Sequence, residues 1–357
     1  MKKSNFSSIE SIIKTVKKNG MFILVDDESK HEEMENEGDL VISTSAVNPN
    51  HINFMAKHAR GLICLAMDNT QSKKIGLTLA SPINQSRSKT AFTYSIEAKK
   101  GVTTGISAYD RAKTIKVAIK NSSGSRDIVS PGHVFPLVSK NGGVLERAGH
   151  TEASVDISKL AKLNPSAVIC EVMNEDGTMA RYNDLVPFSK KHNLKIAKIE
   201  DLISYRLKNE KFIKMISNRK INIKRFGNYD LKVFKNKLDG AEHYAVTSKN
   251  FSYRKSPRVR VISTNIINTI FNFKNNIFKS TLNYLSKFNN FALIIVKSPS
   301  HTKNSKENSK ILRYYGVGAQ IIKELKIKDM ILVSRSKKRI IALKGYGIKI
   351  KKQEILK

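Results

Sequence analysis

Short apolar runs alternate with amphipathic segments along the first 200 residues of the chain. Continuous apolar runs predict buried strands at 21–25, 62–67, 133–138 and 167–173. Apolar residues at helical spacing predict helices in the segments 7–20, 48–61 and 107–120, and segment 142–163 predicts a loop that leads into a helix. Strands that alternate with helices in this way indicate a single α+β (mixed α/β) domain.

Local signals give the boundaries of these elements. Ser7 and Glu10 have the spacing of a capping box for the first helix, while Asn48 caps and Pro49 begins the second. The proline inside 133–138 predicts that this strand lies at a sheet edge, or that the proline sits at a strand end, because proline cannot donate to the ladder.

The composition changes after about residue 208 toward Lys, Asn, Ile and Phe. Segment 195–212 predicts a last strand and a helix, and 298–310 predicts a polar, flexible loop. A helix around Gln320 and a strand at 329–334 follow. We therefore expect a second, smaller α/β domain, with residues 1–205 forming the first domain and residues 206–357 the second.

The net charge of +34 is unevenly distributed. Residues 1–200 contain 28 basic and 21 acidic residues, a difference of +7, whereas residues 201–357 contain 36 and 9, a difference of +27. Such an excess suggests nucleic acid or an anionic surface as a partner, but abundant Lys, Ile and Asn also fit a compositional drift. The excess positive charge therefore belongs mainly to the second half, and the two halves have to be considered separately.

Two cysteines, Cys64 and Cys170, are too few for a disulfide framework or a Cys-rich zinc site. Both lie in apolar runs, which predicts buried, reduced thiols. No apolar run reaches the length of about 18 residues that a membrane helix needs, and no signal peptide is visible. We expect a cytoplasmic protein with no membrane partner.

Three clusters in the first half could carry chemistry. They are the acidic loop 26–39 with Glu35 and Asp39, the segment 147–152, and Glu171 in an apolar strand. Each has a plain structural alternative: a solvated loop, a helix entry with Thr151 as N-cap, and a strand-end residue reached by water. Glu171 nevertheless requires a partner or a shifted pKa if its strand is buried, as the apolar sequence around it predicts.

These residue types suit phosphosugar chemistry with a hard metal ion. Glu35 and His150 supply an oxygen and a nitrogen ligand, and Mg²⁺ commonly uses few protein ligands. Arg147 with the Thr151 amide at a helix N-terminus is a natural phosphate clamp. Glu171 and His133 are candidate proton carriers. Spacing alone does not identify the reaction.

Six motifs extend this interpretation: M-E-N-E-G-D-L, G-L-I-C-L-A-M, T-T-G-I-S-A-Y-D-R-A-K-T-I, P-G-H-V-F-P-L, G-G-V-L-E-R-A-G-H-T-E-A and C-E-V-M-N-E-D-G-T-M-A-R. In this order, and over residues 5–205, the chain resembles the 3,4-dihydroxy-2-butanone 4-phosphate synthases of riboflavin biosynthesis. The resemblance implies a homodimeric lyase that converts D-ribulose 5-phosphate to L-3,4-dihydroxy-2-butanone 4-phosphate and formate. It also implies Mg²⁺ or Mn²⁺, two ions per site, no organic cofactor, and sites near the subunit interface.

The same resemblance assigns roles to residues. It implies His133 and Glu171 as essential acid/base residues, and Glu35 and His150 as metal ligands. The substrate-binding residues that it implies are Glu35, Asp39, Thr104, Arg147, Ala148, Gly149, His150, Thr151 and Glu171. Proton abstraction next to a carbonyl gives an enediolate, which divalent ions can stabilise.

One position departs from the family motif R-E-N-E-G-D. Met34 stands where the family has arginine, and the acidic run before it is about four residues longer than usual. A thioether cannot make the charge-assisted contacts of a guanidinium. Either Lys30 or His31 substitutes for it, or substrate binding is weakened and KM is raised.

The second half resembles, more faintly, the GTP cyclohydrolase II domain that often follows this synthase. The resemblance rests on segments 259–263, 313–325, 331–340 and 343–348. That enzyme needs three zinc-binding cysteines, whereas residues 206–357 contain none. Their places are taken by Asn265, Asn276 and Phe278, and residues 296–303 replace a segment of the type R-Q-E-G-R-G-I-G. We therefore expect a degenerate domain without zinc and without cyclohydrolase activity.

Three explanations remain for this second domain. It supports the dimer or the first domain, it binds RNA, nucleotide or another anion, or it is decaying without selection. Specific nucleic-acid binding is the less favoured of these, because no RNA or DNA motif is present and the aromatic residues have core spacing.

Overall fold

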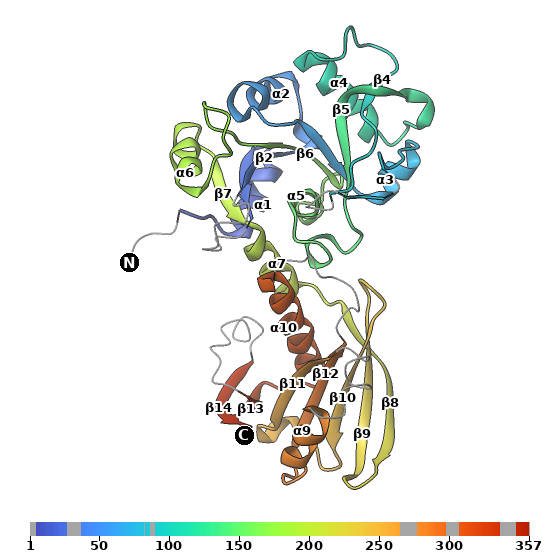
Figure 1. Cartoon of the computed structure of the whole chain (residues 1–357), viewed down its shortest axis with the longest axis vertical. Coiled ribbons are helices and arrows are strands. Elements are labelled where there is room, and N and C mark those ends of the chain that lie inside the picture. The colour runs from blue at the N-terminus through green and yellow to red at the C-terminus, as the bar shows by residue number, and fades with distance from the viewer. Residues whose placement is uncertain are drawn as a thin grey trace. The chain divides into compact units, whose positions relative to one another are not determined.

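The chain divides into two units, Met1–Ile203 and Ser204–Lys357, each built around one sheet (Figure 1). The computed structural model describes residues 5–26, 37–81, 83–85, 90–264, 277–297, 307–335 and 348–356. The two sheets and their helices confirm the expected α+β class with a second, smaller α/β unit.

The sheet of the first unit has the strand order β4-β5-β3-β6-β2-β1-β7. Its strands are β1 (Phe22–Val25), β2 (Gly38–Ser43), β3 (Cys64–Met67), β4 (Ile96–Ala98), β5 (Ile128–Val138), β6 (Ser166–Glu171) and β7 (Lys195–Lys198). The pairs β1–β7 and β3–β5 are parallel and the other pairs are antiparallel. The mixed sheet brings strands far apart in the sequence side by side.

Helices cover both faces of this sheet (Figure 1). They are α1 (Ile9–Lys17), α2 (Pro49–Phe54), α3 (Asn69–Lys74), α4 (Ala108–Ile119), α5 (His150–Leu160), α6 (Tyr182–Lys191) and α7 (Ile199–Asn209), and α7 runs across the division between the units. Helix α5 packs against β1, β2, β3 and β6, with α1 beside it, while α2 and α4 pack together on the opposite face.

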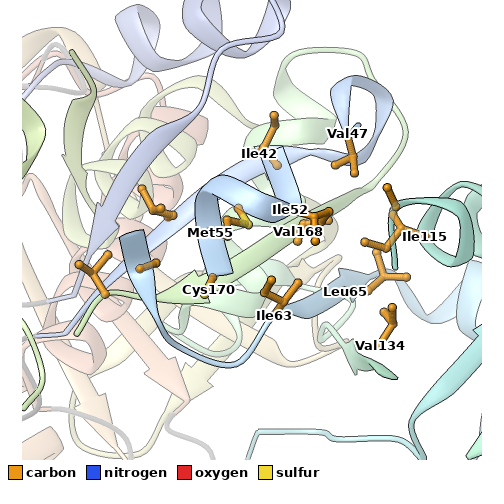
Figure 2. Close-up of a cluster of buried hydrophobic side chains, with 14 of the residues drawn as sticks. Ile42, Val47, Ile52, Met55, Ile63, Leu65, Ile115, Val134, Val168 and Cys170 are labelled. Atoms are coloured by element: carbon orange, nitrogen blue, oxygen red, sulfur yellow. The ribbon is translucent and has the colours of Figure 1, made fainter. Parts of the chain in front are cut away.

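The core on the α2–α4 face decides which way the strand side chains point. Leu40, Cys170 and Val134 belong to this buried cluster, in which Ile52 and Met55 are also fully buried (Figure 2). Successive side chains in a strand point to opposite faces. Neighbours of these residues, among them Asp39, Glu171 and His133, therefore point toward the α5 face.

The predicted caps at Asn48 and Ser107 are confirmed. Asn48 accepts a hydrogen bond from the His51 N–H (3.2 Å), and Ser107 caps α4 through the Asp110 N–H (3.0 Å). Helix α1, in contrast, is capped by Ser8, whose hydroxyl accepts from the Ser11 N–H. The capping box at Ser7 was therefore wrong by one residue, because Ile9 has to be the first helical residue in order to be buried.

Strand β5 is not at the edge of the sheet, so the edge position that its proline predicted as one alternative is wrong. It lies between β4 and β3, and Pro136 pairs with Leu65 of β3. The Pro136 carbonyl accepts from the Thr93 N–H (3.0 Å) on the other side. The N–H and C=O of one residue point to the same side of a strand. The N–H that Pro136 lacks would therefore point away from β3, and no hydrogen bond between β3 and β5 is lost.

The second unit has the strand order β14-β13-β11-β12-β10-β9-β8. Its strands are β8 (Ile213–Ile223), β9 (Gly227–Asn236), β10 (Glu242–Ser248), β11 (Arg258–Thr264), β12 (Phe291–Lys297), β13 (Asp329–Ser334) and β14 (Lys349–Ile355). Strands β8 to β10 form an antiparallel meander, and β11 to β14 are parallel to one another. The strand predicted at 329–334 is β13.

Two described helices complete the second unit, α9 (Ile277–Leu285) and α10 (Glu307–Glu324). Leu282 and Leu285 of α9 belong to its core cluster, together with Phe291 of β12. The flexible loop expected at 298–310 is wrong at its end, because residues 307–310 form the first turn of α10; residues 298–306 lie outside the described residues. No helix in the described ranges has both the length and the apolar character that crossing a membrane requires.

Candidate active site

Several of the predicted site residues meet at one end of the first sheet, on the α5 face. Cys64 of β3 pairs with Ile169 of β6 on one side and with Phe135 of β5 on the other. Glu171 follows Ile169 by two residues and His133 precedes Phe135 by two residues. Because β6 runs antiparallel to β3 and β5 runs parallel to it, Glu171 and His133 lie at the same end of the sheet and on the same face.

Asp39 and Glu171 form a cross-strand pair of carboxylates. Asp39 is the second residue of β2, not part of the preceding loop as the sequence suggested, and it is only 3% exposed. Burial raises the pKa of Asp39 to about 7, His150 opposes the rise, and Glu171 adds to it. Asp39 Oδ1 is buried and has no hydrogen-bond partner among the residues that the structure describes. A cation or a substrate proton would satisfy this oxygen.

Glu171 ends β6 and is half-buried, as its strand-end alternative supposed. Its Oε2 accepts a hydrogen bond from the Leu62 N–H (2.9 Å). A Cβ on Gly61 would lie 2.3 Å from the Glu171 carbonyl oxygen and 2.8 Å from Oε2. Glycine is therefore required there if the chain before β3 is to pass against this carboxylate.

Helix α5 brings His150 to the same place. Its ring Nε2 lies 3.2 Å from the carbonyl oxygen of Leu24 in β1 and 3.9 Å from Asp39 Oδ1. The N-cap of α5 is Gly149, so Thr151 is the second helical residue and the alternative of Thr151 as N-cap is wrong. The N–H groups of the first turn make this helix end suited to an anion.

Arg147 is held by a buried partner that the sequence did not single out. Its Nη1 donates to Glu152 Oε2 (2.5 Å) and its Nη2 donates to the Thr90 hydroxyl (2.8 Å). Glu152 is 1% exposed and also accepts from the Lys140 N–H (3.1 Å). Burial raises the pKa of Glu152, and the charge of Arg147 opposes that rise. The guanidinium is thus fixed before any substrate arrives.

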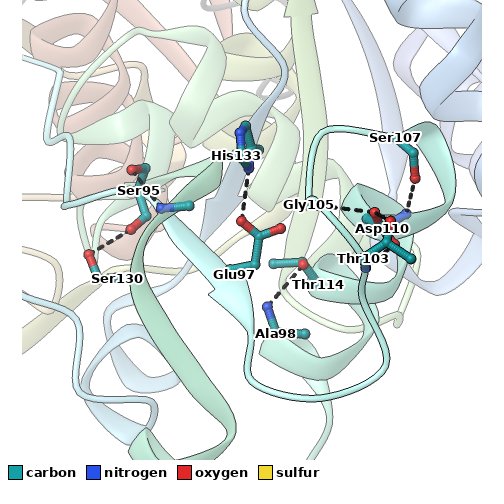
Figure 3. A network of polar contacts seen from close by, with 11 residues as sticks. Ser95, Glu97, Ala98, Thr103, Gly105, Ser107, Asp110, Thr114, Ser130 and His133 are labelled. Atoms are coloured by element: carbon teal, nitrogen blue, oxygen red, sulfur yellow. Dashed lines mark hydrogen bonds and ion pairs between the residues drawn. The ribbon is translucent and has the colours of Figure 1, made fainter.

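His133 also has a carboxylate partner that the sequence reading missed. Its Nδ1 lies 2.9 Å from Glu97 Oε2 (Figure 3). Glu97 is in β4, next to β5, and its side chain is 12% exposed whereas that of His133 is 42% exposed. Glu97 ends the run Tyr94–Ser95–Ile96–Glu97. The alternation of apolar and polar residues there could have predicted a strand with Glu97 on the face opposite to buried Ile96.

The remaining predicted residues fall into two groups. Thr104 is exposed in the loop before α4, and Ala148 and Gly149 are half-buried in the turn before α5. Glu35 and Met34, with Lys30 and His31, lie outside the described residues. The roles of all these residues stay predictions.

The residues present fit a divalent cation in one respect. His150 Nε2 and Asp39 Oδ1 lie 3.9 Å apart, and Asp39 Oδ1 has no hydrogen-bond partner among the described residues. Because the Leu24 carbonyl can only accept, Nε2 donates to it in this structure and would have to exchange this hydrogen bond for a metal ion. Oxygen ligands with a neutral imidazole are a donor set that Mg²⁺ and Mn²⁺ accept. Within the described ranges no three His, Cys, Asp or Glu side chains are grouped for a metal ion, and Glu35, the other expected ligand besides His150, is outside those ranges.

Two family models and many known proteins match this chain. The family model of 3,4-dihydroxy-2-butanone 4-phosphate synthase matches residues 10–205, and that of GTP cyclohydrolase II matches residues 283–354. The chain is 39% identical over 374 residues to the riboflavin biosynthesis protein RibBA of Aquifex aeolicus, with 97% of this chain and 91% of that protein covered. It is 42% identical over 344 residues to the 3,4-dihydroxy-2-butanone 4-phosphate synthase of Helicobacter pylori, with 93% and 94% covered.

Solved structures give the same picture. The two-domain 3,4-dihydroxy-2-butanone 4-phosphate synthase RibBX of A. baumannii superposes with a TM-score of 0.84 at 36% identity, covering 98% of this chain and 99% of that chain. A 3,4-dihydroxy-2-butanone 4-phosphate synthase in complex with two magnesium ions has a TM-score of 0.54 at 34% identity, covering 57% and 98%. Both units of this chain therefore have counterparts of known structure.

Proposed function

Because the chain belongs to the 3,4-dihydroxy-2-butanone 4-phosphate synthase family, we propose that its first unit converts D-ribulose 5-phosphate to L-3,4-dihydroxy-2-butanone 4-phosphate and formate, a step of riboflavin biosynthesis. The observation that carries the proposal is the cluster of Asp39, Glu171 and His150 at one end of the sheet, with His133 at the same end. These are the residues that the family motifs assign.

Each side chain then has a distinct task. The α5 N-terminus and Arg147, held by Glu152, bind the phosphate of the substrate. Asp39 accepts a substrate hydroxyl, which satisfies its unpartnered Oδ1. Glu171, fixed by the Leu62 N–H, and His133, fixed by Glu97, move the protons that enolisation and formate release require.

His150 and Glu35 would hold Mg²⁺ or Mn²⁺, two ions per site, and the substrate's oxygens would complete the coordination. When bound, the metal polarises the carbonyl and lowers the cost of the enediolate charge. The relative whose solved structure contains two magnesium ions supports this assignment. We propose no zinc and no organic cofactor.

The active form is a homodimer in this proposal. Seven large apolar side chains of the first unit are exposed around β4, β5 and the segments beside them: Leu79, Ile83, Phe92, Tyr94, Ile106, Tyr109 and Val129. Exposed apolar side chains gathered in one region are typical of an interface. A second copy of the chain would cover them close to Glu97 and His133, as expected for sites near the subunit interface.

The second unit has no GTP cyclohydrolase II activity in this proposal. After Cys170 the sequence contains no cysteine, so the three zinc thiolates of that enzyme have no counterpart. Of the three residues at those places, Asn265 and Asn276 lie outside the described residues, and Phe278 is partly buried against the core of α9. The Helicobacter pylori relative covers nearly the whole chain and carries only the synthase name. A structural role and anion or RNA binding remain the alternatives for this unit, and the cytoplasmic location stays a prediction.

Formate release from D-ribulose 5-phosphate with Mg²⁺ tests the proposal directly. Purified full-length protein should release one formate per 3,4-dihydroxy-2-butanone 4-phosphate, and EDTA should abolish the release. Absence of turnover at saturating substrate and Mg²⁺ would refute the proposed activity.

A further inference from the structure

Glu97 lies beside the imidazole of His133, on the side opposite its Nε2. We propose that Glu97 is a positioning residue that fixes the tautomer and orientation of His133, with Gly105 and Gly132 as the two backbone positions that make room for this pair. The inference rests on the proposed function, because it assumes His133 to be a proton carrier.

The contact itself determines which ring nitrogen carries hydrogen. Glu97 Oε2 lies 2.9 Å from His133 Nδ1, and an ionised carboxylate can only accept a hydrogen bond. Nδ1 therefore carries the proton in the neutral ring, and Nε2 keeps its lone pair. Because the His133 side chain is 42% exposed and that of Glu97 only 12%, the free nitrogen is the accessible one. A proton accepted at Nε2 gives an imidazolium next to an ionised carboxylate.

The backbone around His133 is built to allow this contact. Strand β4 pairs Ile96 with Val134 but Glu97 with Val129, so residues 130–133 of β5 bulge out opposite a single step of β4. The Ser95 hydroxyl accepts from the Gly132 N–H (3.2 Å). A Cβ on Gly132 would lie 2.2 Å from the carbonyl carbon and oxygen of Ile96, so only glycine permits this approach.

The loop before α4 closes over the other side of the Glu97 carboxylate (Figure 3). A Cβ on Gly105 would overlap Glu97 Oε1, and Gly105 has a φ of +87°, which favours glycine. Buried Asp110 holds this loop, since it accepts from the Gly105 N–H (3.1 Å) and from the N–H and hydroxyl of Thr103 (3.2 and 2.7 Å). The segment T-T-G-I-S thus acts on His133 through Glu97.

The second carboxylate oxygen distinguishes this pair from an ordinary structural contact. Within the described part of the chain, Glu97 Oε1 is buried and has no hydrogen-bond partner. A carboxylate that served only to join two strands would gain by using both oxygens, because an unsatisfied buried acceptor is unfavourable. Glu97 instead directs its other oxygen, Oε2, to His133, as expected of a residue that acts through the imidazole.

The tautomer is measurable in the wild-type protein. Long-range ¹H–¹⁵N correlation spectra of the histidine rings at pH 8 distinguish protonation at Nδ1 from protonation at Nε2, and the His133→Asn variant identifies the His133 signals. We expect His133 to be protonated at Nδ1. Protonation at Nε2 would overturn the proposal, and this measurement requires neither enzymatic activity nor the folding of a Glu97 variant.

Kinetics of Glu97→Gln give the second test, with Asp127→Asn as the matched control. Asp127 is an exposed carboxylate just before β5. We expect Glu97→Gln to lower kcat about 10²- to 10⁴-fold, the range for a disturbed general base, with KM changed less than about threefold. Its His133 signals should show loss of the Nδ1-protonated form. Asp127→Asn should change neither quantity.

Two results would overturn the proposal: a Glu97→Gln variant with unchanged kcat, or one that loses kcat while the His133 tautomer stays as in the wild type. Inactive wild-type protein would refute the proposed function instead, and the ring spectra would then decide on the pair alone.

Discussion

Asp39 and Glu171 lie directly opposite each other on the adjacent antiparallel strands β2 and β6, 132 residues apart in the sequence. Directly opposed residues in such a pair place their side chains on the same face. Two like charges at this spacing repel, and the burial of Asp39 adds to the cost of its charge. The sheet thus maintains an unfavourable arrangement at the site that only a bound cation, a proton or a substrate hydroxyl relieves.

Asp39→Asn should stabilise the metal-free protein above neutral pH while abolishing its activity. The folded-state pKa of Asp39 is about 7, above its ordinary value of 3.8. Between these values the folded chain retains a proton that the unfolded chain has lost, so the free energy of unfolding falls as pH rises to about 7 and stays low above it. Asparagine has no proton to lose. In EDTA at pH 8 we expect a Tm at least about 2–4 °C above wild type, the effect of ~1 kcal/mol.

Near pH 4 the same comparison should show little difference, since Asp39 is then protonated in the folded state. Thermal melts followed by circular dichroism at both pH values measure this. A Tm difference between variant and wild type that is the same at pH 4 and pH 8 would contradict the raised pKa.

Gly61→Ala should lower kcat by at least about tenfold, because its methyl group would displace the end of β6 that carries Glu171. Gly124→Ala is the matched control, since a Cβ there meets nothing within 4 Å and Gly124 has a φ of −136°. Steady-state formate release by both variants is the measurement. Equal activities in the two variants would show that the close approach at Glu171 is unimportant.

Glu152→Gln should raise KM for D-ribulose 5-phosphate about 10- to 100-fold, with a smaller effect on kcat. The substitution removes a charge-assisted bond to Arg147 worth ~1.5–3 kcal/mol, so the phosphate-binding guanidinium loses its fixed position. Glu175→Gln serves as control, because the Glu175 side chain is 92% exposed. A variant with normal KM would indicate that Arg147 does not bind the phosphate.

Met34→Arg should lower KM a few-fold, on the order of 1 kcal/mol, if the missing guanidinium of the family motif weakens substrate binding. Met34→Lys is the informative companion, since lysine has the charge but not the bidentate geometry. Initial rates over a range of substrate concentrations decide. Unchanged KM in both variants would mean that Lys30, His31 or another group already fills this role.

Full-length protein should release no formate from GTP, with or without added Zn²⁺, because no cysteine follows Cys170. An authentic GTP cyclohydrolase II assayed in parallel confirms that the conditions support turnover. Clear turnover by this chain would mean that other side chains replace the zinc thiolates. A salt-dependent affinity for RNA in the same preparation would favour the anion-binding alternative for the second unit.

Several elements of the first unit were predicted from the sequence because apolar period and caps are local signals, whereas β2, β4, α3 and α6 were not predicted. Asn48, Ser107 and the buried runs around Leu65 and Val168 are where the patterns placed them. The errors arose where tertiary contacts decide. Asp39 was predicted to lie in an acidic loop, but it pairs with Glu171 and is part of β2. An edge position was one alternative predicted for β5, but the strand lies inside the sheet, where the Pro136 carbonyl accepts from the Thr93 N–H outside the β3–β5 ladder.

The candidate site was only half accessible to sequence reasoning. Residues inside long motifs, such as His150 and Glu171, were found through their chemistry and family resemblance. Glu97 and Glu152 were not singled out, because their importance lies in contacts with His133 and Arg147 that no local pattern encodes. Glu97 meets His133 only when β4 and β5 pair, and Glu152 meets Arg147 only because the turn before α5 brings the guanidinium back onto the first turn of the helix.

The parallel pairing of Phe22 with Lys195 in β1 and β7 has a consequence for the order of folding. The edge strand β7 can be added only after the chain has been synthesised past Lys198. The pairing of Asp39 with Glu171 and the contact of His150 with Leu24 also span more than a hundred residues, so loop closure has to precede them. A nascent first unit therefore lacks a complete sheet until late in its synthesis. In this sequence 159 residues follow Lys198, and domains generally fold as units during synthesis, the amino-terminal one first. A carboxy-terminal unit without catalysis of its own would still give the synthase time to fold before release.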